Sequence, residues 1–432
     1  MKKSVLILLI ISMPATVSLT AQKAITLKDC YEKAAEASSL AGEKDSYSSI
    51  WQLKDKNFTR GWLPSLDASG SFLYNSEVID LSNSLGSIPI PGIADAIKPL
   101  PHEQYKFTVD INQVIYDGGT IKGARLIEKS DLQLNQKQTE TELYKLRSQI
   151  NQYFFNLLLL EKQEELLKNY LNLIEKRISS IQSALVNGMA LKSDAEVMTS
   201  ERIKLTQQLK ENEIRKESLL KILNDLTGME IDSSSELLMP QIEEDINPQL
   251  ARPELEVFDL RKEQLSAGLR LIDSKKLPKV FGFATLGYGN PPGNNFFRDE
   301  FAPYYILGAG VKWNIFDWNK ARDEKQIINL QKRIIDNRKD DLTDNLNRLL
   351  EGKKSEINSL KSLIGSDTEL IALRKSITLS AESKYENGTI TATELLNEIN
   401  SEKQAVINYE IHKINLALSQ VEYLNICGKD IE

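Results

Sequence analysis

Apolar residues recur along the middle of the chain at alternating intervals of three and four positions. The series runs from Leu143 to Leu185 and is interrupted only at Glu164. The surrounding stretch 120–186 contains no proline and, of glycine, only Gly123. Such spacing predicts one continuous helix with a coiled-coil stripe. At 1.5 Å per residue, a helix over this stretch would reach about 100 Å.

Asn-Gly pairs then predict tight reversals of the chain. After the first pair, Asn187-Gly188, we expect a second helix over 192–227. The second pair, Asn387-Gly388, likewise follows a long predicted helix and precedes a shorter one. The remaining helices are expected over 27–60, from Pro253 (a proline in the first turn) to about Lys276, over 320–386 and over about 392–426, while 229–250 is irregular and acidic.

Strict alternation of apolar and polar residues predicts β-strands in the proline- and glycine-rich windows. The alternation is clear in 65–74, 105–112 and 305–315, and weaker in 279–289. One face of each strand would therefore contact lipid and the other water. Aromatic side chains near the segment ends suit a membrane interface, namely Tyr74, Tyr105, Tyr305 and Trp313.

The chain contains the same arrangement twice. Asn387-Gly388 follow Asn187-Gly188 by 200 positions, and Glu394 follows Asp194 by the same interval. A period this long is not that of a solenoid and indicates one large unit that is duplicated. We expect a first repeat over 22–228, with a strand hairpin at about 65–115, an irregular segment over 229–250, and a second repeat over 251–432, with a strand hairpin at about 279–316.

The first residues have the pattern of a secretory signal peptide. Met1-Lys2-Lys3 precede an apolar run from Val5 to about Ile11, and small residues follow up to Ala21. We expect residues 1–21 to be cleaved and the protein to be exported in a bacterium. No other stretch approaches the roughly 20 apolar residues of a membrane helix. If the protein sits in a membrane, it does so as β-strands.

Composition argues against nucleic-acid binding and catalysis. The chain carries 54 Lys and Arg against 61 Asp and Glu, a net charge of −7, without a basic run. His102 and His412 are the only histidines, and no metal-ligand spacing is present. A Gly-x-Ser-x-Gly motif and a phosphate-binding loop are also missing. Cys30 and Cys427 could pair if the termini meet, but two unpaired buried thiols are the favoured interpretation.

Four membrane strands cannot close a barrel, because single-chain barrels begin at eight strands. An open edge in lipid leaves unpaired backbone groups, each of which costs several kcal/mol. Other copies must therefore complete the sheet: two copies give eight strands, and three give twelve around a wider lumen. The alternative is a structural periplasmic coiled-coil protein with two hairpins and no pore.

The residues resemble the TolC-like outer-membrane efflux proteins over nearly the whole mature chain. The resemblance rests on the paired Asn-Gly tips and on three motifs, Leu63-Pro64-Ser65-Leu66, Gln113-Val114-Ile115-Tyr116-Asp117-Gly118-Gly119 and Arg252-Pro253-Glu254-Leu255. It implies an α+β membrane protein of two repeats, with long antiparallel α-helical coiled-coil hairpins forming a periplasmic tunnel. It also implies four strands per protomer in a shared 12-stranded trimeric β-barrel.

The same resemblance implies a location, partners and a task. The homotrimer would sit in outer-membrane lipid, extend into the periplasm, and dock with a periplasmic adaptor (membrane fusion) protein. An inner-membrane transporter of the RND or ABC type would supply the energy. The task would be multidrug efflux or type I secretion, with no cofactor and no chemistry on the cargo.

The resemblance further assigns a gate at the periplasmic end. Glu394 takes the position of an acidic ring, and Asn397 stands where a second acid is usual. Three Glu394 side chains around an axis would repel one another and attract cations. Tyr385 and Asp194 match positions that hydrogen-bond across helices. Ser193 matches another constraint, whose usual arginine partner is Ile390 here, so this gate is expected to be held less tightly.

Plainer roles exist for all of these residues. Glu394 and Asp194 could be ordinary acids at helix starts, where the dipole favours negative charge. Asn187, Gly188, Asn387 and Gly388 are first of all turn residues that need positive φ. Adaptor docking at the same tips is implied only by the resemblance.

Overall fold

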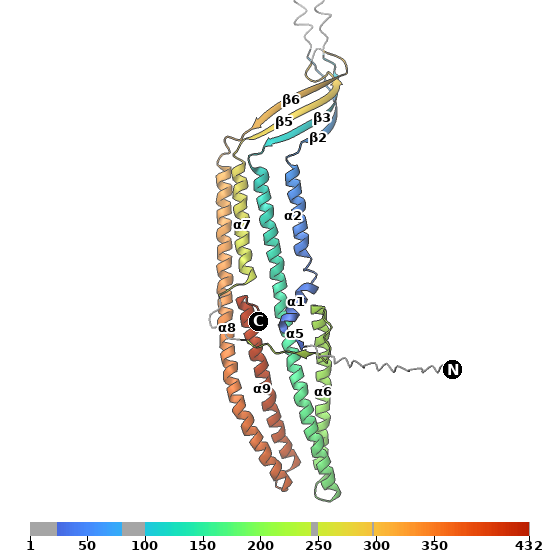
Figure 1. Cartoon of the computed structure of the whole chain (residues 1–432), viewed down its shortest axis with the longest axis vertical. Helices are drawn as coiled ribbons and strands as arrows, with labels where there is room; N and C mark the ends of the chain where they lie inside the picture. The colour runs from blue at the N-terminus through green and yellow to red at the C-terminus, as the bar shows by residue number, and fades with distance from the viewer. Residues whose placement is uncertain (1–23, 80–99, 243–248, 296–297, 432) are drawn as a thin grey trace, which may run out of the picture. The chain divides into compact units, whose positions relative to one another are not determined.

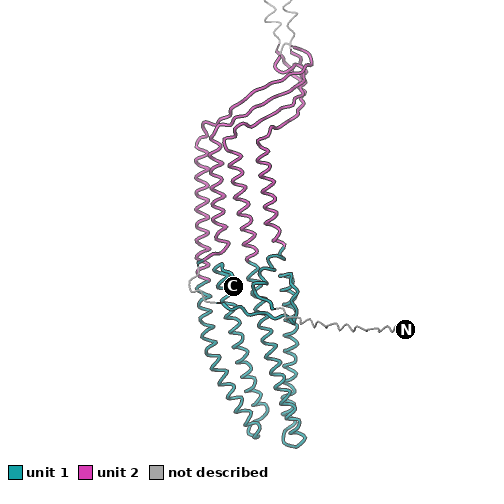
Figure 2. The backbone as a smooth tube through the Cα atoms, in the orientation of Figure 1, with its two compact units in different colours: residues 1–38, 145–249, 350–432 teal, residues 39–144, 250–349 magenta. Residues whose placement is uncertain are grey.

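The structure is a computed structural model that describes residues 24–79, 100–242, 249–295 and 298–431. The expected signal peptide over 1–21 lies outside the described residues, as does the part of the irregular segment over 243–248. The chain divides into two compact units (Figure 2). Unit 1 comprises 1–38, 145–249 and 350–432, and unit 2 comprises 39–144 and 250–349.

The four helices expected around the Asn-Gly pairs are present (Figure 1). Helices α5 (Thr120–Val186) and α8 (Lys320–Glu386) each contain 67 residues. Helices α6 (Lys192–Thr227) and α9 (Ala392–Cys427) each contain 36 residues. Both shorter helices end at a glycine in the left-handed region, because a residue without a Cβ adopts that backbone conformation at little cost.

The N-terminal segment differs from the prediction of one helix over 27–60. It forms two helices, α1 (Leu27–Ala37) and α2 (Glu43–Arg60). Helix α1 ends at Ala37, the backbone of the following Ser38 is extended, and Gly42 is the N-terminal capping residue of α2. Two adjacent serines compete for backbone hydrogen bonds and glycine weakens a helix, so the helical pattern does not continue across 38–42.

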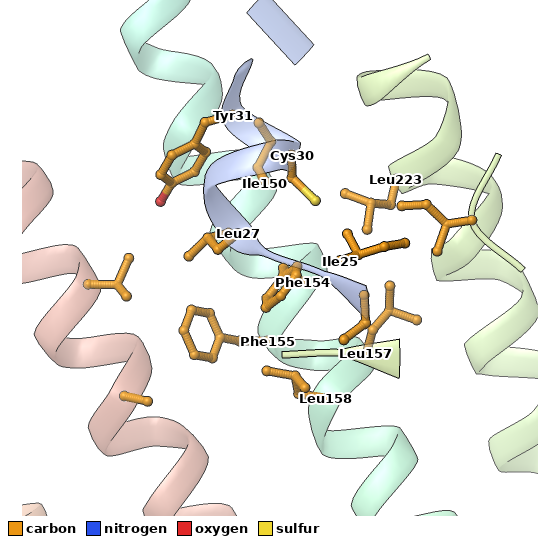
Figure 3. Close-up of a cluster of buried hydrophobic side chains, with 14 of the residues drawn as sticks. Ile25, Leu27, Cys30, Tyr31, Ile150, Phe154, Phe155, Leu157, Leu158 and Leu223 are labelled. Carbon is orange, nitrogen blue, oxygen red and sulfur yellow. The ribbon is translucent and has the colours of Figure 1, made fainter. Parts of the chain in front are cut away.

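Unit 1 has its apolar core where α1, α5, α6 and α9 meet (Figure 3). Phe154 and Leu157 of α5 are fully buried against Leu27 of α1 and Leu223 of α6. A two-residue strand, β1 (Ala24–Ile25), pairs in parallel with β4 (Glu236–Leu237) beside this core. The segment 229–250, expected to be irregular, thus contains one short strand among its described residues.

Cys30 and Cys427 are both buried in unit 1, and no disulfide joins them. Desolvation by burial, with a smaller contribution from the Asp29 carboxylate, raises the pKa of the Cys30 thiol to about 12. The favoured interpretation, two buried thiols without a disulfide between them, is confirmed, and a buried thiol with a raised pKa such as Cys30 is chemically inert.

Unit 2 carries a four-stranded antiparallel sheet in the order β2-β3-β5-β6. The strands are β2 (Ser65–Tyr74), β3 (Glu103–Tyr116), β5 (Lys279–Asn290) and β6 (Ala302–Lys312). Strand β3 is longer than its alternating part. Strand β6 begins and ends three residues earlier than expected, which leaves Trp313 and Ile315 beyond it. Helix α7 (Pro253–Ser274) begins, as predicted, with proline in its first turn.

Candidate functional site

The two helical hairpins of unit 1 turn in the same way at their tips. Gly188 has φ 71° and Gly388 has φ 70°. In each tip two backbone N–H groups bond back to the preceding helix end: Gly188 to Leu185 (3.0 Å), Met189 to Ala184 (2.8 Å), Gly388 to Tyr385 (2.9 Å) and Thr389 to Lys384 (2.9 Å). This pattern is the Schellman motif, which satisfies carbonyl groups that the helix end would leave unpaired.

The tip asparagines complete these turns. The side-chain amide of Asn187 donates to the carbonyl oxygen of Ser183 at 2.9 Å, and that of Asn387 donates to Ser383 at 2.8 Å. The four tip residues therefore have the local role that turn chemistry predicts for them.

Glu394 begins helix α9 as part of a complete capping box. Its backbone N–H donates to Oγ1 of Thr391 at 3.2 Å, and its carboxylate accepts from the Thr391 backbone at 2.7 Å. That backbone hydrogen bond, followed by one from the Thr391 hydroxyl, lowers the pKa of Glu394. The carboxylate is thus held ionised at the start of a helix. Glu394 and Asn397 are both exposed and lie three positions apart, on one face of α9.

Asp194 holds the corresponding place in α6, but only half of the box exists there. Its carboxylate accepts from the Leu191 backbone at 3.4 Å. Leu191 is the capping residue, and its side chain has no oxygen that could accept a bond in return. Asp194 is half-buried and Ser193 is exposed.

Tyr385 lies at the end of α8, packed against the apolar cluster shared by the two hairpins. Burial raises the pKa of its phenol, the Asp194 carboxylate raises it further, and the Arg177 guanidinium opposes both. The structure therefore brings Tyr385 and Asp194 within electrostatic reach of each other. Ile390 packs against the same cluster, so an apolar contact occupies the place of the expected arginine.

Two ion-pair groups between the hairpins were not foreseen from the sequence. Arg177 of α5 pairs with Glu382 of α8 and lies 3.6 Å from a carboxylate oxygen of Glu386. Lys403 of α9 donates to Glu201 of α6 at 3.2 Å, with both side chains nearly buried. Each helix of one hairpin is thereby tied to a helix of the other. The partners stand about 200 positions apart in sequence, so only packing identifies them.

The sheet of unit 2 has one face covered by apolar side chains, and many of these are exposed. The register places Leu66 opposite Ile111, Val109 opposite Leu286, and Ala284 opposite Leu307. Leu66 and Leu307 are 69% and 71% exposed, which is extreme for leucine in a sheet. An apolar face of this kind indicates a contact that the single chain does not supply.

The opposite face of the sheet is polar over β2 and β3, whereas on β5 and β6 it carries Phe281, Phe283 and Ile306. The hydroxyls of Ser69 and Thr108 lie 2.8 Å apart across β2 and β3. Asp110 accepts from Thr108 at 2.9 Å and from Thr285 at 2.6 Å. The register therefore separates an apolar from a hydrophilic face in β2 and β3, as the alternation predicted, while β5 and β6 carry apolar side chains on both faces.

The edges of this sheet are unpaired. Among the described residues, β2 and β6 each have one neighbouring strand. Neither side of the sheet closes on the other within those residues, so backbone donors and acceptors along both outer strands have no partner strand.

Within the described residues, none of the helices combines the length and the apolar character needed to cross a bilayer. The same residues contain no group of three or more His, Cys, Asp or Glu side chains placed to hold a metal ion.

Several solved structures that are similar to this chain are outer-membrane proteins. The chain is similar to the Campylobacter jejuni channel CmeC (TM-score 0.62, 14% identity, 93% of this chain and 84% of that one). It is also similar to the Vibrio cholerae protein VceC (0.64, 13%, 94% and 97%) and to the open state of the Neisseria gonorrhoeae channel MtrE (0.65, 12%, 94% and 89%). No family model and no curated protein matches the sequence.

Proposed function

Since this chain has the fold of the TolC-like outer-membrane channels, we propose that it is the outer-membrane exit duct of an efflux or secretion system. The observation that supports this best is the sheet of unit 2, which has an exposed apolar face, a second face that is polar over β2 and β3 and, among the described residues, two unpaired edges. Lipid suits the first face and a water-filled lumen suits the second.

The unpaired edges argue for an oligomer. In lipid, each unpaired backbone group costs several kcal/mol, so β2 of one copy must bond to β6 of the next. Three copies give twelve strands, which is enough for a lumen. The working form in this proposal is a homotrimer in the bacterial outer membrane that extends into the periplasm. The chain within it is built from two repeats, 22–228 and 251–432.

The hairpin tips are the proposed periplasmic gate. Asp194 and Tyr385 form its latch, Glu394 its acidic ring, and Ser193 and Asn397 lie beside them on exposed positions. Asn187, Gly188, Asn387 and Gly388 form the tips on which a periplasmic adaptor docks. An inner-membrane transporter supplies the energy, and this chain provides a passive conduit without cofactor or catalysis.

Fractionation and conductance together test the proposal. The protein is expected in the outer-membrane fraction, as a trimer in mild detergent, and is expected to give discrete conductance steps in planar bilayers. Recovery only from the soluble periplasmic pool would instead favour a structural coiled-coil protein without a pore.

A further inference from the structure

A groove between α2, α5 and α7 in unit 2 gathers positive charge on an acidic protein. Its volume is about 720 Å³, and four of its lining residues are cations: Lys122, Arg125, Lys129 and Arg270. The only acid among its lining residues is Asp55. A net charge of about +3 is therefore concentrated here on a chain whose overall charge is −7.

Three of these cations have no counter-ion among the residues that the structure describes. Arg125 is neutralised by Asp55, to which it donates at 2.7 Å. Within the part of the chain that the structure describes, Lys122, Lys129 and Arg270 form no ion pair. Other cations of these helices do form ion pairs, for example Lys54 with Glu128 and Lys137 with Glu256. The groove thus gathers four cations around one acid, and that acid is engaged by Arg125.

The groove also offers apolar and open surface. Trp51 of α2 and Leu126 of α5 line it together with Gly119 and Gly123. Gly119 has no atom within 4 Å of the position that a Cβ would take. A smaller hollow of about 300 Å³ shares Leu126, Lys129 and Arg270 with it and adds one acid, Glu263. An anion with an attached apolar portion would match both kinds of surface.

We infer that this basic groove binds a phosphate-bearing anion. Lysine and arginine are the side chains that recognise phosphate, because their charged N–H donors bond strongly to its oxygens. The volume exceeds that of a single phosphate, and the indole of Trp51 and the side chain of Leu126 would contact the remainder of the ligand.

The source of the phosphate follows from the proposed function, on which this step rests. Gly119 comes three residues after the end of β3 at Tyr116. With the sheet in the outer membrane, the groove begins where the strands leave the bilayer, at the depth of lipid headgroups. The ligand is then the headgroup of an anionic phospholipid. A soluble phosphate ester would present the same phosphate group and is the alternative that the experiment distinguishes.

Binding by the purified full-length protein in neutral detergent tests the inference. The probes are dihexanoyl phosphatidylglycerol, glycerol 3-phosphate and zwitterionic dihexanoyl phosphatidylcholine. Binding of each probe is measured by calorimetry and by tryptophan fluorescence. We expect saturable binding of the phosphatidylglycerol that weakens with salt and is about tenfold tighter than binding of the phosphatidylcholine. Equal binding of glycerol 3-phosphate would identify a soluble ester as the source. Failure of both anions to bind would overturn the inference.

A charge-matched pair of variants locates the site. The triple variant K122Q/K129Q/R270Q should lose at least about tenfold in affinity. K210Q/R215Q/K221Q removes three exposed cations of α6 and should bind as the natural protein does. Equal loss in both triples would show a non-specific charge effect and overturn the site. Conductance is recorded separately, so a channel that conducts without binding refutes the groove alone, and binding without conductance refutes the channel alone.

Discussion

Lys403 of α9 and Glu201 of α6 form an ion pair at 3.2 Å in which both side chains are nearly buried, at 10% and 7% exposure. Lys204 lies 3.9 Å from the same carboxylate at the surface. A buried pair adds little net stability, but removing one partner leaves the other charge uncompensated. The pair therefore fixes which faces of α6 and α9 meet.

Replacing one member of this pair should be costly. We expect Glu201→Ala to lower the free energy of unfolding by about 3–5 kcal/mol, seen as a lower midpoint of thermal unfolding by circular dichroism. Glu196→Ala on the same helix removes an exposed pair with Lys192 and should change stability by less than about 1 kcal/mol. A double change, Glu201→Leu with Lys403→Met, should recover most of the loss. Equal small effects of both single changes would contradict the role of the buried pair.

Arg177 links the two hairpins near their tips and should help to keep the proposed gate closed. Arg177→Gln removes its bonds to Glu382 and Glu386, so the hairpins should separate more readily. We expect a higher resting conductance in planar bilayers. Arg215→Gln removes a pair within one helix and serves as the control. Unchanged conductance in Arg177→Gln would show that this contact does not hold the gate.

The proposed latch of Tyr385 and Asp194 should respond to mutation and to alkali. Tyr385→Phe combined with Asp194→Ala should raise the resting conductance. Burial and Asp194 raise the pKa of Tyr385, so the neutral phenol is favoured in the folded state. The neutral phenol therefore contributes fully to the stability of the folded state below the ordinary tyrosine pKa of about 10. This contribution is lost as the pH rises through the raised pKa of Tyr385. Alkaline opening should therefore weaken in Tyr385→Phe. A conductance that is the same in all variants would place the latch elsewhere.

Much of the fold could be predicted because its signals are local. The heptad spacing located α5, the Asn-Gly pairs located the turns, and alternation located the strands. The break between α1 and α2 was missed, because the apolar pattern of 27–60 continues past the serines and glycine that interrupt it. The length of β3 was underestimated for a similar reason, since its ends do not alternate.

The sequence pointed to candidate gate residues in two ways, through the repeat and, for Tyr385, Ser193 and Asn397, through the family resemblance. The interval of 200 positions identified Asp194 and Glu394, and the structure places both as the third residue of a helix. The repeat interval did not identify Arg177 or the pair of Glu201 and Lys403, because packing between the hairpins determines which residues form these ion pairs. The basic groove could not be predicted either, because Lys122, Lys129 and Arg270 are separated in the sequence and only helix packing brings them together.

The tip glycines should be sensitive to any side chain. Gly388 has φ 70°, where a Cβ costs about 1–2 kcal/mol, so Gly388→Ala should destabilise the α8 and α9 hairpin by about that amount. Gly365 lies inside α8 with open space around it, and Gly365→Ala should stabilise the helix by about 0.5–1 kcal/mol. Opposite shifts of the unfolding midpoint in the two variants are expected. Shifts of the same sign would contradict the left-handed turn at the tip.

Glu394 has two possible contributions, a helix cap and a charge in the proposed pore, and two variants separate them. Glu394→Gln keeps a side-chain oxygen that can accept from Thr391 but removes the charge. We expect it to lower cation preference and block by divalent ions in planar bilayers. Thr391→Val keeps the charge and removes the hydroxyl that accepts from Glu394, so it should reduce helix stability by about 1 kcal/mol without changing selectivity.

The pH dependence of helix stability and of cation selectivity tests both contributions of Glu394 in the natural protein. Bonds from Thr391 lower its pKa, so its contribution to the cap is present above its ordinary value of about 4.3. That contribution is lost as the pH falls through the lowered value. Cation preference should disappear over the same range, because protonation removes the pore charge. Selectivity that survives both acid and Glu394→Gln would remove Glu394 from the pore and leave it as the cap of α9.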